Sequence, residues 1–266
     1  NWGYWSFNVC ICNRLTSSDF VGYVLVHANI YLTLSSISIA ASICSWEHIP
    51  TDNITGFPVL FNFCKNNNID VTQDVNNYNL SNIDLVISYG WGKLIKDKLI
   101  EKPKIGCINF HPAPLPEWRG MGGVFNYALY EQVKEWGVSA HFVDKTFDTG
   151  DIIKVNRFKI DSSKHNIHSL TKISHEKLLS LYKEIIEIIL NNSSIPRFPQ
   201  KEGRYISKKD LDQLREIKPT DTTEIIDKKI KACFCPPHHG AYITLKDKQY
   251  SIVNSEILNN IIQYEK

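Results

Sequence analysis

Three prolines in five positions constrain the folding of this chain more than any other local feature. Pro112, Pro114 and Pro116 directly follow an apolar run, Gly106–Phe110, that predicts a short buried strand. Proline has no backbone N–H and is excluded from the interior of a helix or of a central strand. The strand must therefore end near His111, and the chain must leave it through a stiff loop.

Asn109 and His111 are the polar residues at the end of this strand. Side chains at positions i and i+2 of a strand project from the same face, so we expect the amide and the imidazole to be neighbours. In open α/β sheets, ligands bind beyond the carboxyl ends of the strands. The sequence therefore predicts a functional site next to His111.

Strand-like and helix-like segments alternate over the first two-thirds of the chain. Strands are predicted at 6–12, 85–88, 106–110, 137–143 and 151–158, and helices at 123–131 and 168–190. This alternation is typical of an α/β fold with a mostly parallel sheet.

The chain changes character after residue 191. The stretch 193–200 holds two prolines and predicts a linker, so we expect a catalytic domain over 1–193 and a small α+β domain over 194–266. A helix at about 222–233 and a turn at 246–248 between two strands are expected in the second domain.

The segment from Phe20 to Trp46 has no Asp, Glu, Lys or Arg and is longer than the ~20 residues that span a bilayer. It carries many Ser, Thr and Asn residues and has no basic flank, which argues against a membrane span. We predict instead a helix at about 18–29 and a strand at about 35–43 in a soluble domain.

Composition narrows the function classes. The 30 basic and 28 acidic residues leave a net charge of +2, so no strong electrostatic attraction to nucleic acid is expected. The 7 cysteines are an odd number with no disulfide-scaffold spacing, which favours reduced thiols in a cytosol. Two Cys-x-Cys pairs are spaced more closely than the paired ligands of familiar zinc sites, so no metal is predicted.

The residue types near the strand end suit acyl transfer. An Asn amide can donate a hydrogen bond to a developing oxyanion, and a His can move a proton near neutral pH. Asp148, in a turn between two apolar strands, is the carboxylate expected to orient His111. No glycine fingerprint G-x-G-x-x-G follows the first strand, which argues against a nicotinamide enzyme.

The motif set resembles a known family. Asn109-Phe110-His111-Pro112, then Leu115-Pro116 and Arg119-Gly120, and later Asp148-Thr149-Gly150, are similar to the 10-formyltetrahydrofolate-dependent formyltransferases. The resemblance covers about residues 80–190 and reaches the second domain through Pro236-Pro237-His238-His239-Gly240. It implies a Rossmann-like, mostly parallel sheet, the formyltransferase fold, with a small C-terminal α+β domain.

The resemblance also implies a mechanism. A neutral acceptor amine attacks the formyl carbon of 10-formyltetrahydrofolate, and Asn109 donates a hydrogen bond to the oxyanion. His111 acts as a base or as a second electrophile, and both roles stay open. Asp148 orients His111 and helps to remove the amine proton.

Binding residues are expected on either side of this chemistry. The family's pterin cleft maps by resemblance onto Val86, Ser88, Tyr89, Gly90, Trp91, His141, Val143 and Asp144. In family members that act on a sugar nucleotide, the diphosphate needs cations or backbone N–H donors, and an aromatic ring can stack on the base. The candidates are Lys93, Arg119, Gly122, Gly123, Arg204 and Tyr205.

Within the family, the stretch 110–123 and the stretch 136–139 look most like the nucleotide-sugar N-formyltransferases of polysaccharide biosynthesis. The expected acceptor is dTDP- or UDP-4-amino-4,6-dideoxyglucose, with UDP against dTDP and a 3-amino against a 4-amino sugar left open. Methionyl-tRNA formyltransferase and 10-formyltetrahydrofolate hydrolase are the alternatives, besides a binding module without chemistry. We expect a cytoplasmic protein that binds neither nucleic acid nor membrane, and a homodimer is one expectation for its oligomeric state.

Overall fold

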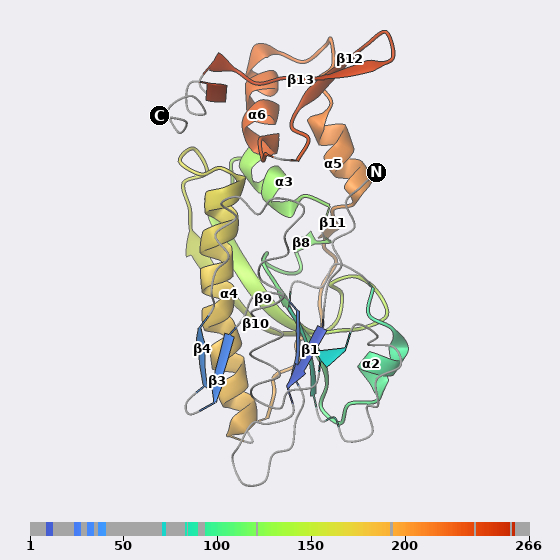
Figure 1. Cartoon of the computed structure of the whole chain (residues 1–266), viewed down its shortest axis with the longest axis vertical. Helices are drawn as coiled ribbons and strands as arrows, with labels where there is room; N and C mark the ends of the chain where they lie inside the picture. Colours follow the sequence, from blue (N-terminus) through green and yellow to red (C-terminus); the bar gives the residue numbers. More distant parts are fainter. Residues whose placement is uncertain are drawn as a thin grey trace. The chain divides into compact units, whose positions relative to one another are not determined.

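Figure 1 shows the fold as a computed structural model of the chain. The structure describes residues 83, 85–89, 94–120, 122–191, 194–236, 238–255 and 257–258. Nearer the N-terminus it describes the backbone of five short strands. These are β1 (Val9–Cys12), β2 (Val24–His27), β3 (Tyr31–Leu34), β4 (Ile37–Ala40) and β5 (Val71–Thr72).

The chain packs into two compact units, each made from several stretches. The first unit comprises Asn1–His111, Ser139–Val155 and Leu178–Gln200. The second comprises Pro112–Val138, Asn156–Lys177 and Lys201–Lys266. The predicted division into a catalytic domain over 1–193 and a C-terminal domain over 194–266 stays a prediction.

The main sheet has four strands in the order β10-β9-β7-β6. These are β6 (Leu85–Tyr89), β7 (Gly106–His111), β9 (Glu135–Phe142) and β10 (Ile152–Lys159). β6 and β7 run parallel, whereas β7 and β9 run antiparallel and place His141 opposite Asn109. The predicted α/β class is confirmed, and the sheet is mixed.

Helix α4 (Ile167–Leu190) covers part of this sheet through its C-terminal half. The ring of Tyr182 lies 5.1 Å from that of Phe110 and 6.4 Å from that of Tyr89. Because side chains alternate along a strand, Asn109 and His111 project from the face opposite Phe110. The helix therefore buries one face of β7, and the polar residues occupy the other. A shorter helix, α2 (Asp97–Glu101), precedes β7.

The second unit is built from three helices and two small sheets. The helices are α3 (Val124–Tyr130), α5 (Lys208–Arg215) and α6 (Thr223–Cys233). β8 (Trp118–Arg119) pairs in parallel with β11 (Arg204–Tyr205), and β12 (Tyr242–Leu245) forms an antiparallel hairpin with β13 (Lys248–Ser251). A Ser207–Asp210 capping box starts α5, and Thr222 caps α6.

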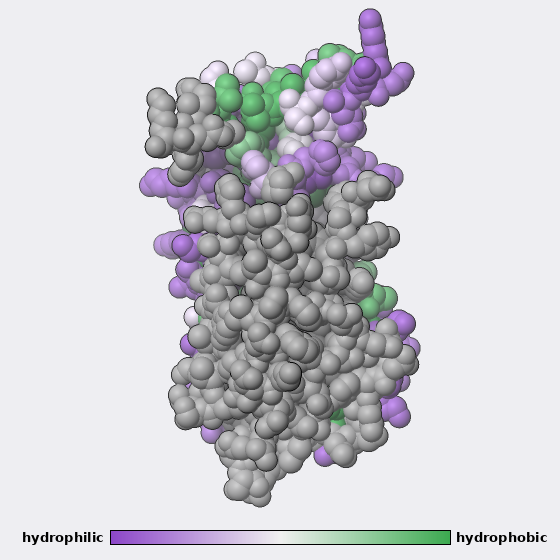
Figure 2. Space-filling model, viewed as in Figure 1, coloured by the Kyte–Doolittle hydropathy of each residue, from purple (hydrophilic) through white to green (hydrophobic). Residues whose placement is uncertain are grey.

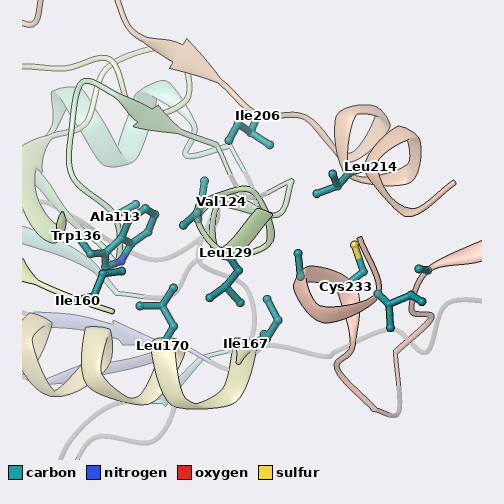
Figure 3. Close-up of a cluster of buried hydrophobic side chains, with 14 of the residues drawn as sticks. Ala113, Val124, Leu129, Trp136, Ile160, Ile167, Leu170, Ile206, Leu214 and Cys233 are labelled. Carbon is teal, nitrogen blue, oxygen red and sulfur yellow. The ribbon is translucent and has the colours of Figure 1, made fainter. Parts of the chain in front are cut away.

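An apolar core holds this unit together, as Figure 3 shows. Trp136, Ala128, Leu170 and Ala232 are fully buried in it and come from β9, α3, α4 and α6. Burial of large apolar side chains is the main favourable term in folding. The predicted helices at 123–131, 168–190 and 222–233 and the predicted hairpin turn are all confirmed.

The N-terminal predictions are confirmed in part. The predicted strand at 6–12 is β1, and β4 lies within the predicted strand at 35–43. The predicted helix at 18–29 is wrong at Val24–His27, which form β2 and pair antiparallel with β1. Val24 and Val26 are β-branched, which favours an extended backbone, and their pairing with β1 stabilises it.

Two observations concern the surface. Within the described residues, none of the helices combines the length and the apolar character needed for a membrane crossing. Figure 2 shows apolar surface among hydrophilic surface at the upper end of the view, where α6 and the β12–β13 hairpin lie. Leu245 and Tyr250 of the hairpin are both exposed.

Candidate active site

Five side chains of the first unit meet at the carboxyl end of β7. Asn109 and His111 come from β7 itself, Ser88 from β6, and His141 from β9. Asp148 comes from the loop between β9 and β10. The three predicted catalytic residues, Asn109, His111 and Asp148, are therefore brought together. Their catalytic roles stay predictions.

The amide of Asn109 is held in one orientation. Ser88 Oγ donates a hydrogen bond to Asn109 Oδ1 at 2.7 Å, so the oxygen end faces β6. Asn109 Nδ2 lies 3.1 Å from His141 Nε2 and 3.4 Å from Asp148 Oδ1. The NH₂ group thus points toward the carboxylate, with its two hydrogens directed at two acceptors.

The tautomer of His141 follows from its neighbours. His141 Nδ1 lies 2.7 Å from the carbonyl oxygen of Phe142, which can only accept, so Nδ1 carries a hydrogen. In the neutral ring, Nε2 is then an acceptor for the hydrogen that Asn109 donates. His141 is 2% exposed, so it orients the amide from within the core.

The carboxylate of Asp148 lies between two imidazole rings. Its Oδ2 is 3.7 Å from His111 Nδ1, and its Oδ1 is 3.4 Å from His141 Nε2. The side chains of His111 and Asp148 are 4% and 9% exposed. A buried carboxylate beside the imidazole of His111 is an arrangement suited to proton transfer, whereas His141 Nε2 is occupied by the amide of Asn109.

The loop that carries Asp148 is closed at its base and cross-linked inside. Phe142 N donates to Asp151 O at 2.8 Å, which joins the two ends of the loop. The carboxylate of Asp144 accepts from Thr146 N at 3.0 Å and from Thr149 Oγ1 at 2.6 Å. Asp144, predicted to contact the pterin, thus organises the loop through its side chain.

The other residues predicted to bind the pterin are mostly packed. Val86 is buried, and so is Tyr89, whose pKa is raised by burial. Half-buried Val143 donates its backbone N–H to Cys107 O at 2.8 Å. Gly90, Trp91 and Lys93 lie outside the described residues. For Val86 and Tyr89, the predicted contacts with the pterin stay predictions.

Of the three cationic residues predicted to bind substrate, Lys93 lies outside the described residues, and Arg119 and Arg204 have partners inside the second unit. Arg119 Nη2 donates to Lys201 O at 2.7 Å. Arg204 Nη1 lies 2.5 Å from Glu131 Oε1, and its guanidinium lies over the ring of Tyr127. Tyr205 is half exposed, and its predicted role in stacking on a base stays a prediction.

Local packing and backbone conformation explain why positions 122 and 123 are glycines. A Cβ on Gly122 would lie 2.0 Å from the carbonyl carbon of Ser207, so only glycine fits against that segment. Gly123 precedes α3 with a φ of +106°, which glycine adopts without strain. The predicted approach of a substrate to Gly122 and Gly123 stays a prediction.

Sequence reasoning missed two roles. Ser88 and His141 were assigned to the pterin cleft, but their side chains bond Asn109. The available signal for His141 was a polar residue within the predicted strand 137–143, but its pairing opposite Asn109 depends on the sheet. Among the described residues, no group of three or more His, Cys, Asp or Glu side chains is placed to hold a metal ion.

Comparisons with known proteins identify the family of the chain. The sequence profile of the Formyl transferase family matches residues 40–186, which is more than half of the chain. The chain is 27% identical to the methionyl-tRNA formyltransferase of Caldanaerobacter subterraneus subsp. tengcongensis, over 67% of this chain and 57% of that protein. It is 26% identical to the GDP-perosamine N-formyltransferase of Brucella melitensis, over 68% of each chain.

Two solved structures share the fold. A 4-N formyltransferase from Francisella tularensis has a TM-score of 0.61 at 23% identity and covers 76% of this chain and 84% of its own. An N-formyltransferase from Helicobacter canadensis, in complex with folinic acid and dTDP-3-aminofucose, has a TM-score of 0.57 at 24% identity. The matched region covers 71% of this chain and 68% of the Helicobacter chain. The chain spans just over half the length of the methionyl-tRNA formyltransferases that it matches. On the match to more than half of its length, the chain belongs to the formyl transferase family.

Proposed function

We propose that this protein transfers the formyl group of 10-formyltetrahydrofolate to the amino group of a nucleotide-linked amino sugar. The observation that carries the proposal is the buried cluster of Asn109, His111 and Asp148 at the carboxyl end of β7. It combines a neutral hydrogen-bond donor, an imidazole and a carboxylate without a nucleophilic side chain. Such a set suits direct attack by an amine on an acyl carbon.

Each residue of the cluster has a role in this reaction. Asn109 Nδ2 donates to the oxygen of the formyl group as negative charge develops there. Its 3.4 Å contact with Asp148 is the weaker of its two, and it is the one that a substrate oxygen can replace. Asp148 accepts the proton that the attacking amine loses, directly or through His111. The bond between the formyl carbon and N10 of the folate then breaks, and the same proton passes to N10, so that tetrahydrofolate leaves with a neutral N10. Ser88 and His141 keep the amide aimed at the reacting oxygen.

The similar proteins support a folate as formyl donor and a nucleotide-linked amino sugar as acceptor. The Helicobacter protein was solved with folinic acid and dTDP-3-aminofucose, and the Brucella relative is named for GDP-perosamine. Our preferred acceptor remains dTDP- or UDP-4-amino-4,6-dideoxyglucose. The role in polysaccharide biosynthesis, the homodimer and the cytoplasmic location belong to the same proposal.

A second candidate is formylation of methionyl-tRNA. The similarity to methionyl-tRNA formyltransferases favours it. The net charge of +2 disfavours it, because affinity for tRNA depends on neutralising phosphates with Lys and Arg.

The test is the loss of 10-formyltetrahydrofolate, followed by absorbance, against a panel of acceptors. The arms are dTDP- and UDP-linked 3-amino and 4-amino sugars, GDP-perosamine, charged initiator tRNA, and buffer. Turnover with one amino sugar and none with buffer is the expected result. Turnover with charged tRNA and with no amino sugar would show that the acceptor is tRNA. Turnover with buffer would indicate a hydrolase. No turnover in any arm would contradict the proposal.

A further inference from the structure

One side chain outside the catalytic cluster holds the Asp148 loop in place. Gln200 Nε2 donates to the carbonyl oxygen of Asp148 at 3.0 Å and to that of Gly150 at 2.6 Å. The amide NH₂ has two hydrogens, and the two carbonyls bracket the residue that follows the carboxylate. Gln200 therefore fixes the backbone of the turn over 148–150.

The turn needs such support because its conformation is unusual. Asp148 has a φ of +55°, a left-handed conformation that is uncommon for residues other than glycine. Gly150 also packs so closely against the base of the loop that a Cβ there would lie 2.0 Å from Phe142 O. The turn is therefore held by close packing at Gly150 and by the two hydrogen bonds from Gln200.

Gln200 is itself anchored by the residues that precede it. Phe198 and Ile152 exchange two backbone hydrogen bonds of 2.8 and 2.9 Å. Arg197 Nη1 lies 3.8 Å from Asp151 Oδ2, and the guanidinium lies over the ring of Phe142. The segment 197–200 thus joins both ends of the loop, Phe142 and Asp151, and the glutamine extends from a fixed backbone.

We propose that Gln200 is a positioning residue for formyl transfer. By holding the 148–150 turn, it sets the Asp148 carboxylate at its distances of 3.4 and 3.7 Å from Asn109 and His111. It acts through Asp148 and touches no reacting atom. The proposal rests on the proposed function, because the effect that it predicts is on the chemical step.

The first test replaces Gln200 with methionine, which keeps the length and removes both donors. A misplacement of about 1 Å at a catalytic group costs about 10²-fold. We expect kcat of Gln200→Met to fall about 10²-fold, while the Kd for tetrahydrofolate and the KM for the acceptor change less than about threefold. Gln213→Met is the matched control, since Gln213 is an exposed residue of α5. A kcat equal to that of the control would overturn the proposal.

The second test uses pH. In Gln200→Glu, a carboxylate would face two carbonyl oxygens and repel them, whereas the protonated acid can donate one hydrogen bond. Facing acceptors raises the pKa of a carboxyl above its ordinary ~4.3. The kcat of this variant relative to wild type should therefore rise several-fold from about pH 8 to about pH 5.5. A ratio that does not change with pH would contradict a role through these two hydrogen bonds.

Hydrogen exchange separates this proposal from the proposed function. Peptides that cover 144–150 should exchange at least about tenfold faster in Gln200→Met than in wild type or Gln213→Met, whatever the activity. If wild type shows no formyl transfer, the proposed function fails and exchange alone decides whether Gln200 holds the loop. If wild type is active and Gln200→Met shows unchanged exchange and kcat, only the positioning role fails.

Discussion

The catalytic cluster of the first unit and the apolar core of the second unit are both buried, but they are built from opposite materials. The cluster joins Ser88, Asn109, His141 and Asp148 through polar contacts of 2.7 to 3.4 Å. The core packs purely apolar side chains such as Leu129 and Leu170 against one another (Figure 3). Burying a polar group costs free energy unless it is bonded, whereas burying an apolar group stabilises the fold. The two regions should therefore respond differently to mutation.

The largest effect is expected in the cluster. Asp148→Asn removes the proton acceptor, and loss of a general base costs about 10²–10⁴-fold. We expect turnover to fall by about 10³-fold while tetrahydrofolate binding and the free energy of unfolding stay near the wild-type values. Steady-state kinetics, calorimetry and urea unfolding measure the three quantities. Asp247→Asn, at the exposed hairpin turn, is the control. Unchanged turnover would remove Asp148 from the mechanism.

The core should show the converse behaviour. Leu170 is fully buried, and Leu170→Ala leaves a cavity that costs about 3 kcal/mol of unfolding free energy. At a temperature where the variant is folded, kcat should stay within about twofold of wild type. Leu245→Ala removes the same atoms from an exposed position and should cost less than about 0.5 kcal/mol. A large loss of kcat in Leu170→Ala would mean that the two regions are not independent.

How far the sequence predicted each region depends on the kind of contact. Asn109 and His111 were predictable because three prolines end their strand. Asp148 was predictable because it lies in a turn whose distance from His111 along the chain matches the family motif. The core helices were predictable from apolar periodicity. Gln200 gave no signal, because it bonds backbone carbonyls about 50 residues away and leaves no pattern in the side chains.

Other features were missed for physical reasons. The antiparallel direction of β9 depends on a long-range pairing, and a strand pattern alone does not give direction. β8 and β11 have two residues each, too few for any periodicity. The strand at Val24–His27 depends on pairing with β1, which overrides a local expectation of helix.

The smallest expected effect is on the free energy of unfolding and comes from one ion pair in the second unit. Here a buried polar contact stabilises the fold and has no role in the chemistry. Lys229 Nζ lies 2.6 Å from Asp221 Oδ2 and also donates to Glu216 O. The backbone N–H of Lys218 and the Lys229 ammonium lower the pKa of Asp221 below its ordinary value. The carboxylate therefore contributes to the free energy of unfolding above about pH 4. This contribution is lost as the pH falls through the lowered pKa of Asp221.

Asp221→Asn tests this pair. Hydrogen bonds to a charged group contribute about 1.5–3 kcal/mol, so we expect a loss of about 2 kcal/mol at pH 7. Urea unfolding from pH 7 to pH 3 should show a smaller decline in the variant than in wild type. Equal declines would show that Asp221 does not contribute to the acid sensitivity, and kcat at pH 7 should be unaffected in either case.

The most direct measurement of the central claim is a double-mutant cycle across the cluster. Asn109→Ala, Asp148→Asn and the double variant are compared for kcat and for unfolding free energy. Residues that act as one catalytic unit are strongly non-additive. We predict that the double variant loses little more turnover than the worse single variant, with each unfolding free energy within about 1 kcal/mol of wild type. Additive losses in turnover, or losses explained by unfolding, would contradict a cluster built for formyl transfer.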